Sequence, residues 1–277
     1  MLSRFLRWLA RDLQAALSLG FLLLLVVVAL AAPWIAPHSP IEQNFDMILA
    51  PAGPGHPLGT DDLGRDILSR LLHGAGITLY ASFLAVGVAV LIGVPVGLLA
   101  GYAGGWVDDV ISRIIDTLLS FPAIVLAIAV TGALGIGMTN AMISVGIVFS
   151  PQLARIVRAR TLVVRQELYV DAARCFGAGT GRILWRHVLP NTVQPVIVQV
   201  TLLLAAALLA EASLSFLGLG IQPPDPSWGA MLARAYQSME IAPEQMYPPG
   251  LAILLTALAF NTLGESLRAA LDPTMKT

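Results

Sequence analysis

Charged side chains, lysine and cysteine are scarce in this sequence. Only 12% of its 277 residues are charged, whereas soluble domains carry roughly 25%. The net charge is -1 and Lys276 is the single lysine, which excludes nucleic-acid binding as a property of the whole chain. The one cysteine, Cys175, cannot form an internal disulfide, and no activating neighbour in the sequence marks it as a nucleophile.

Motifs for catalysis and cofactor binding are missing as well. The chain has no Gly-Lys dipeptide and therefore no G-x-x-x-x-G-K-[ST] phosphate loop, so we expect it not to hydrolyse ATP. The histidines lack metal-ligand spacing, which predicts no metal site; they are His38, His56, His73 and His187. An intramembrane hydrolase finds no support, because no G-x-S-x-G motif is present and no serine has an obvious base on an adjacent span. We expect neither an enzyme nor a cofactor bound by this chain.

Apolar residues dominate the sequence instead. They make up 57% of the chain, and the mean hydropathy is +0.79. Arg4, Arg7 and Arg11 precede an uncharged run over residues 13–32, which has about the ~20 residues that a helix needs to cross a bilayer. This run is longer than the roughly 7–15 apolar residues of a secretory signal peptide. We therefore interpret residues 1–36 as a cytoplasmic N-terminus and a first transmembrane helix.

Further apolar segments follow along the chain. Residues 37–76 are predicted to be an external segment with an amphipathic helix that opens at Thr60. A translocation core is expected over residues 77–271, with spans near 77–101, 113–134, 138–158, 193–217 and 250–267, followed by a cytoplasmic tail over residues 272–277. Gly93, Gly97 and Gly101 have the small-xxx-small spacing of closely packed membrane helices. The sequence thus predicts an all-α polytopic membrane protein with six transmembrane helices and both termini inside.

A polar, arginine-bearing loop over residues 160–191 interrupts the apolar segments. In its middle, Tyr169, Ala172, Ala173 and Phe176 share one face of a short helix, which Gly177 then ends. Two alanines between two aromatic rings could enter a groove on another protein. The alternative is an ordinary basic loop, since positive residues flank short cytoplasmic loops in most membrane proteins.

Three blocks resemble one family of transporters. Asp171-Ala172-Ala173, Gly177 and Leu189-Pro190 are spaced as in the EAA loop of the membrane subunits of binding-protein-dependent ABC importers, although Asp171 stands where Glu is usual and His187 where an aliphatic residue is usual. The stretches 56–70 and 211–220 resemble the C-type subunits of the oligopeptide, dipeptide and nickel permease branch. The resemblance covers residues 56–273.

This resemblance implies a type I ABC importer permease fold in the inner membrane of a bacterium. The chain would form half of the translocation path for di- or oligopeptides, with nickel or another small solute as the alternative cargo. Its implied partners are a homologous second permease, two cytoplasmic ATPase subunits that hold ATP and magnesium, an extracytoplasmic substrate-binding protein and membrane lipid. The residues implied to contact the ATPase are Tyr169, Asp171, Ala172, Ala173, Arg174, Phe176, Gly177, Leu189 and Pro190.

Carboxylates inside the predicted spans are separate candidates. Asp116 and Glu211 are costly to place in a bilayer, so they either line or gate the path or serve as structural partners between helices. Together with Glu265 they also allow a different hypothesis, an ion-conducting or proton-relay subunit. Trp228 and Tyr247, in a predicted external loop over residues 221–248, are candidates for anchors at the membrane interface.

Overall fold

The structure is a computed structural model that describes residues 12–271. Within this range the chain is helical and forms no strand. The longer helices are α2 (Leu13–Ile35), α3 (Ile67–Ala103), α4 (Gly105–Leu119), α5 (Ala123–Leu134), α6 (Met138–Val164), α7 (Leu168–Cys175), α9 (Leu189–Phe216), α10 (Trp228–Gln237) and α11 (Tyr247–Leu271). Shorter pieces are η1 (Phe45–Met47), α8 (Thr180–Ile183), the π-helical turn η2 (Leu184–Val188) and η3 (Pro243–Met246). The predicted N-terminal arginines and the tail over 272–277 lie outside the described residues.

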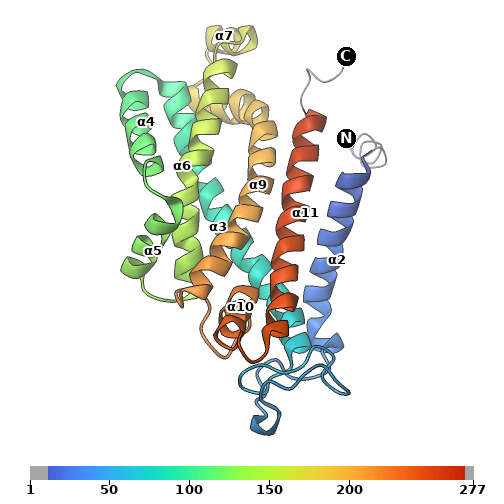
Figure 1. The fold of residues 1–277 in the computed structure, drawn as a ribbon. Helices are drawn as coiled ribbons and strands as arrows, with labels where there is room; N and C mark the ends of the chain where they lie inside the picture. The colour runs from blue at the N-terminus through green and yellow to red at the C-terminus, as the bar shows by residue number, and fades with distance from the viewer. Residues whose placement is uncertain (1–11, 272–277) are drawn as a thin grey trace.

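The helices are long and apolar enough for a membrane bundle. Five of them could cross a bilayer, and α4 and α5, bent by 97° at their junction, together make a sixth candidate. The bundle has two ends (Figure 1). The α7 end holds α7, the start of α2 and the end of α11, while the α10 end holds α10 and the segment between α2 and α3. This architecture confirms the predicted all-α fold, with the third span broken.

The start of α3 differs from the prediction. A single helix of 37 residues contains both the predicted amphipathic helix and the second span, and it begins at Ile67 rather than after Thr60. Asp66 is the N-cap, and its carboxylate accepts from the backbone N–H of Ser69 at 2.8 Å. Before it, the Asp61 carboxylate accepts the N–H groups of Leu63 and Arg65 at 2.9 and 3.0 Å. These local bonds hold a turn that competes with the helix.

The third span is also not one straight helix. Helix α4 begins at Gly105, earlier than the predicted residue 113, and ends at Leu119 before Pro122. Proline disfavours helical geometry in the residue before it, so Phe121 leaves the helix and the chain turns sharply into α5. Proline is the only cue for this break in the sequence, and Pro95, Pro151 and Pro195 lie inside continuous helices.

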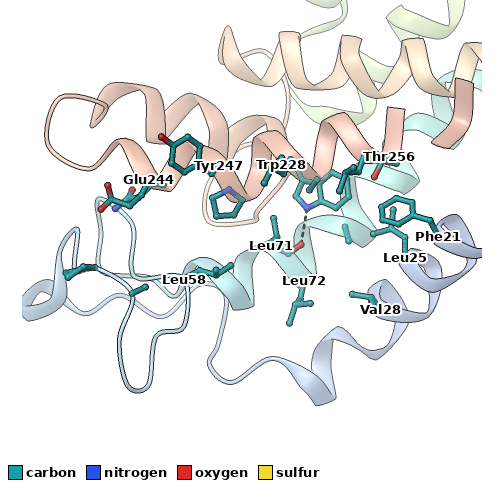
Figure 2. Close-up of a pocket in the computed structure, with 18 of the residues that line it drawn as sticks. Phe21, Leu25, Val28, Leu58, Leu71, Leu72, Trp228, Glu244, Tyr247 and Thr256 are labelled. Atoms are coloured by element: carbon teal, nitrogen blue, oxygen red, sulfur yellow. Dashed lines mark hydrogen bonds between the residues drawn. The ribbon is translucent and has the colours of Figure 1, made fainter. Parts of the chain in front are cut away.

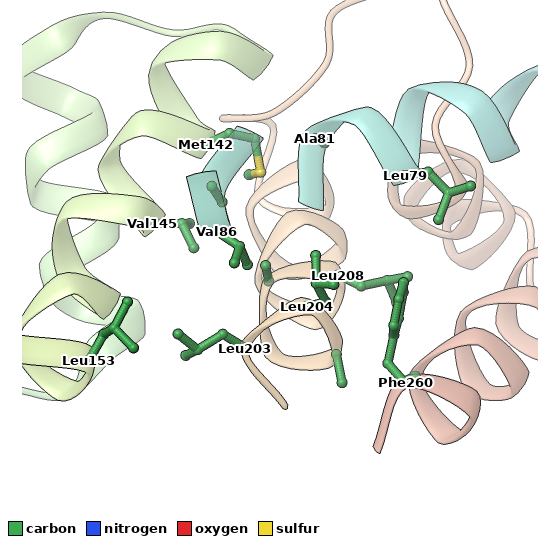
Figure 3. Packing of buried hydrophobic residues seen from close by; sticks show 14 of the residues in the cluster. Leu79, Ala81, Val86, Met142, Val145, Leu153, Leu203, Leu204, Leu208 and Phe260 are labelled. Atoms are coloured by element: carbon green, nitrogen blue, oxygen red, sulfur yellow. The ribbon is translucent and has the colours of Figure 1, made fainter. Parts of the chain in front are cut away.

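Close packing of α3 on α6 follows the predicted glycine spacing. A Cβ at Gly93 would lie 2.7 Å from the Ser150 carbonyl oxygen, and one at Gly97 would lie 2.5 Å from that of Ala154. Neither backbone could approach so closely with any larger residue at these positions. The core continues from this contact onto α9 and α11 (Figure 3). Its buried side chains include Met142 and Val145 of α6, Leu204 and Leu208 of α9, and Phe260 of α11.

Candidate functional site

Helix α7 projects from one end of the bundle beyond the ends of the spans (Figure 1). Its sequence neighbours hold it there: α6 leads into it, and α8 and the π-helical turn lead back into α9. Val170, Ile183 and Val188 are 0%, 1% and 0% exposed. They belong to the same apolar core cluster as Val164 at the end of α6. The projecting helix is therefore seated on an apolar base rather than hanging free.

The outward side of this loop carries large apolar side chains. Phe176 is 91% exposed and Tyr169 is 43% exposed, and Ala172 is also exposed, as expected of a face that meets another protein. Ala173 is half-buried against the core, so the predicted common face is not wholly outward. Sequence reasoning missed Leu168 and Trp185, which are 85% and 74% exposed. The cue for Trp185 was an aromatic residue between two arginines in a polar loop.

Two arginines connect this loop to the end of α3. The Arg174 guanidinium lies 5.4 Å from the centroid of the Tyr102 ring and donates to the Asp171 carboxylate at 3.0 Å. The interaction with Tyr102 is the main reason that the pKa of Arg174 is raised, so the guanidinium stays charged. Arg165 donates to the Gly101 carbonyl at 2.9 Å and so caps the end of α3. The α7 loop is thereby joined to the end of α3 at two points.

The remaining predicted loop residues define how the chain leaves and re-enters the bundle. Gly177 has φ +78°, which favours glycine, and its N–H donates to the Arg174 carbonyl at 2.9 Å, ending α7. Leu189 and Pro190 do not lie at the tip: they open α9, where Leu189 is half-buried and Pro190 is exposed. Proline suits this first turn because it has no N–H that needs a partner.

Asp116 is not buried within the described chain. Its side chain is 65% exposed and forms an ion pair with Arg155 on α6, whose side chain is 55% exposed. A second pair joins the same helices, since Arg158 donates to the Asp108 carboxylate at 2.6 Å. Arg155 and Arg158 therefore hold α4 to α6.

Glu211 has the opposite environment. It is 1% exposed, and the Ser215 hydroxyl donates to its Oε1 at 2.8 Å. Its Oε2 has no hydrogen-bond partner among residues 12–271. Glu211 lies where α10 packs closely on α9, since a Cβ at Gly229 would come within 2.5 Å of the Ala212 Cα. Asp116 and Glu211 are thus in unrelated surroundings and do not form one site.

A cavity of about 580 Å³ lies at the α10 end between α2, α3, α11 and the segment around Pro51 (Figure 2). Its walls are mostly apolar and include Phe21, Leu25 and Leu71; neither Asp116 nor Glu211 lines it. Trp228 also lines it but is only 1% exposed, and its indole N–H donates to the Leu71 carbonyl at 3.0 Å. The prediction that Trp228 anchors the membrane interface is therefore wrong, because the ring is a core residue.

The segment before α3 forms a buried ion-pair network at the same end. Arg65 is 1% exposed, and its Nε and Nη2 atoms both lie 2.7 Å from the Asp61 carboxylate. Asp62 pairs with Arg234 of α10 at 2.9 Å, and Arg70 donates to the Pro40 carbonyl at 2.6 Å. The block over residues 56–70 thus joins the segment between α2 and α3 to α10.

A bundle of membrane spans that presents a short helix with apolar side chains at one end is the architecture of a transporter's membrane subunit. Residues 93–277 match the family model described as binding-protein-dependent transport system inner membrane component. Residues 1–52 match the N-terminal TM domain of oligopeptide transport permease C. The chain belongs to this family of inner-membrane permease subunits of ABC importers.

Individual relatives agree with this assignment. The chain is 49% identical over 274 residues to the glutathione transport system permease protein GsiD of Escherichia coli O6:K15:H31 (strain 536 / UPEC), covering 98% of this chain and 90% of the relative. The same identity and coverage hold for GsiD of Shigella boydii serotype 4 (strain Sb227). The fold is similar to that of the inward-facing MetNI methionine ABC transporter, with a TM-score of 0.59 at 20% identity over 74% of this chain and 98% of the other.

Proposed function

We propose that this chain forms half of the translocation path for short peptides in an ATP-driven importer. The observation that supports coupling to an ATPase is the projecting helix α7, which rests on an apolar base and leaves Phe176 and Leu168 more than four-fifths exposed. Large apolar side chains exposed beyond the ends of the spans favour contact with a protein partner. The cargo class rests on relatives named for glutathione transport, because glutathione is itself a short peptide.

The proposed partners follow from the same assignment. A homologous second permease would complete the path, two ATPase subunits would hold and hydrolyse ATP with magnesium, and a substrate-binding protein would deliver the cargo. The arginines of the α7 loop favour the cytoplasmic side for that end, which would place both termini in the cytoplasm and the α10 end outside. The fourth span's end and the loop contribute Arg155, Arg158, Arg160, Arg165, Arg174, Arg182 and Arg186.

Coupling in this proposal depends on contacts that α7 makes within the chain. ATP can shift the permease only if the ATPases hold its two states with different affinity. The residues proposed to meet the ATPase are the exposed Tyr169, Asp171, Ala172 and Phe176, with Ala173 behind them. Arg174 would pass a displacement to α3, whereas Gly177, Leu189 and Pro190 would set the geometry of the return into α9.

The two intramembrane carboxylates are proposed to have different roles. Glu211 is enclosed beneath α10 and would hold that helix in place, so that its substitution would alter the α10 end rather than the path wall. Asp116 is exposed in this chain together with its partner Arg155, and it faces away from the core, where a second permease could meet it. We favour gating at Asp116 over gating at Glu211.

The docking role can be tested with Phe176→Asp in the reconstituted complex. We expect substrate-stimulated ATP turnover to fall about 100-fold or more, because a charge replaces an apolar contact at the centre of a protein interface. The assembled permease pair should remain. The matched control is Ile241→Asp, a side chain 77% exposed at the α10 end. Full turnover with Phe176→Asp, or equal losses in both variants, would contradict the docking role.

A further inference from the structure

Two histidines and a carboxylate that are far apart in the sequence meet at the α10 end. The ligand atoms of His38, His56 and Asp66 all lie within 4.8 Å of one another. The Nδ1 of His56 is 2.9 Å from one Asp66 oxygen, and the Nδ1 of His38 is 3.9 Å from the other. The sequence, whose histidines have no metal-ligand spacing, gives no sign of this cluster, because an irregular segment brings them together.

We propose that His38, His56 and Asp66 form a zinc site. Zinc is bound by imidazole nitrogen and carboxylate oxygen at about 2.0–2.2 Å in tetrahedral geometry, so that its ligand atoms lie roughly 3.4 Å apart. The His56 and His38 nitrogens lie 2.9 and 3.9 Å from the Asp66 oxygens, on either side of that value. Because all three ligand atoms lie within 4.8 Å of one another, no pair has to close by more than about 1.4 Å to bind one ion. Two imidazoles favour zinc over magnesium or calcium, which prefer oxygen ligands only.

The charge balance around Asp66 supports a cation at this position. Its side chain is 0% exposed, and its only ion-pair candidates among residues 12–271 are the two histidines. The neighbouring carboxylates differ, since Asp61 and Asp62 both pair with arginines. Ser69 donates twice to one Asp66 oxygen, at 2.8 and 2.7 Å, which leaves the other oxygen to His56. A buried carboxylate with no permanent cation beside it is costly, and zinc would neutralise it.

The histidines are positioned as ligands by their surroundings. The backbone N–H of His38 donates to the Ser69 hydroxyl at 3.0 Å, and the rings of His38 and His56 stack with centroids 4.6 Å apart. Zinc would bind the Nδ1 of the neutral His56 ring, which then carries its single proton on Nε2. Binding in this tautomer transfers no proton to another residue. The His38 side chain is 39% exposed, which leaves the fourth coordination position open to water on that side.

Zinc here would link the segment between α2 and α3 to the N-cap of α3. His38 and His56 come from two points of that segment, and Asp66 caps the helix. Three ligands on one ion act as a cross-link that only the folded chain offers, so bound zinc stabilises the fold. The role we infer is structural, at the end of the bundle opposite α7.

The test uses the purified transporter complex with the full chain, first stripped with a chelator and then dialysed against micromolar Zn²⁺. We expect the zinc content per complex, measured by elemental analysis, to fall by one equivalent per chain in His38→Ala/His56→Ala. His187→Ala, on the α7 loop, is the matched control and should lose none. His56→Cys should keep the equivalent, because a thiolate also binds zinc. Added Zn²⁺ should raise the melting temperature of the parent complex and leave that of the double variant unchanged.

Equal zinc content in the parent and the double variant would overturn the site, as would an equal loss in His187→Ala or binding seen only at millimolar Zn²⁺. Should the double variant fail to assemble, His38→Asn changes only the most exposed ligand. It should then weaken zinc binding at least tenfold, and unchanged affinity would also overturn the proposal.

Discussion

The two ends of the bundle use arginine in opposite ways. At the α10 end, Arg65 is 1% exposed and meets the Asp61 carboxylate with two nitrogens. At the α7 end, Arg174 has a side chain 43% exposed and contacts Tyr102 and Asp171. Buried ion pairs are rigid and costly to break, whereas exposed ones contribute little to stability. The α10 end is therefore held by buried ion pairs, whereas the α7 end, which we propose a partner moves, is held by exposed ones.

Arg65→Ala is expected to show the largest difference between the two ends. Removing one partner of a buried ion pair leaves an uncompensated charge, so we expect a loss of about 3–5 kcal/mol in the free energy of unfolding. Thermal unfolding of the detergent-solubilised complex measures it. The matched control is Arg155→Ala, in the exposed pair with Asp116, where about 1 kcal/mol or less is expected. Similar losses in both variants would remove the distinction between buried and exposed pairs.

A second variant tests the packing of α3 on α6 between the two ends of the bundle. Gly97→Ala adds a Cβ 2.5 Å from the Ala154 carbonyl oxygen, so α3 and α6 must separate and we expect about 1–3 kcal/mol of destabilisation. Gly87→Ala, on the same helix with nothing within 4 Å, is the control and should be neutral or slightly stabilising. The midpoint of thermal unfolding compares them. A neutral Gly97→Ala would show that close α3–α6 packing is not needed.

The smallest expected change in stability is at the α7 end, with Arg174→Ala. We expect the free energy of unfolding to change by less than about 1 kcal/mol, because the contacts are exposed. Transport per ATP hydrolysed in proteoliposomes should nevertheless fall about tenfold, since α7 loses its link to α3 at Tyr102. Arg182→Ala, also exposed in this loop, is the control. Unchanged coupling in Arg174→Ala would show that α7 moves α3 by another route.

Much of the fold could be predicted, because membrane spans leave a strong hydropathy signal. Five of the six predicted spans, the close helix packing at Gly93 and Gly97, and the end of α7 at Gly177 all follow from local composition and spacing. The prediction of a helix from Thr60 was wrong, because the Asp61 side chain binds backbone N–H groups that a helix would need. Local propensity cannot tell whether a carboxylate will cap a helix or close a turn before it.

The candidate site residues could be predicted only in part from the sequence. The apolar and small residues of α7 could be chosen from the sequence, but only the structure distinguishes the exposed Phe176 from the half-buried Ala173. It also separates Glu211, enclosed beneath α10, from Asp116, exposed beside Arg155. The depth of a carboxylate depends on which helices pack over it, and a single sequence does not carry that information.

A membrane bundle, a polar loop and a transporter-like pattern follow from the sequence, because hydropathy and motif spacing are local properties of the chain. Which charges meet follows from the folded structure alone. It joins Asp62 to Arg234, and His38 to Asp66, across stretches of chain with no regular period. Such contacts depend on how irregular segments fold back on the helices, which no spacing rule describes.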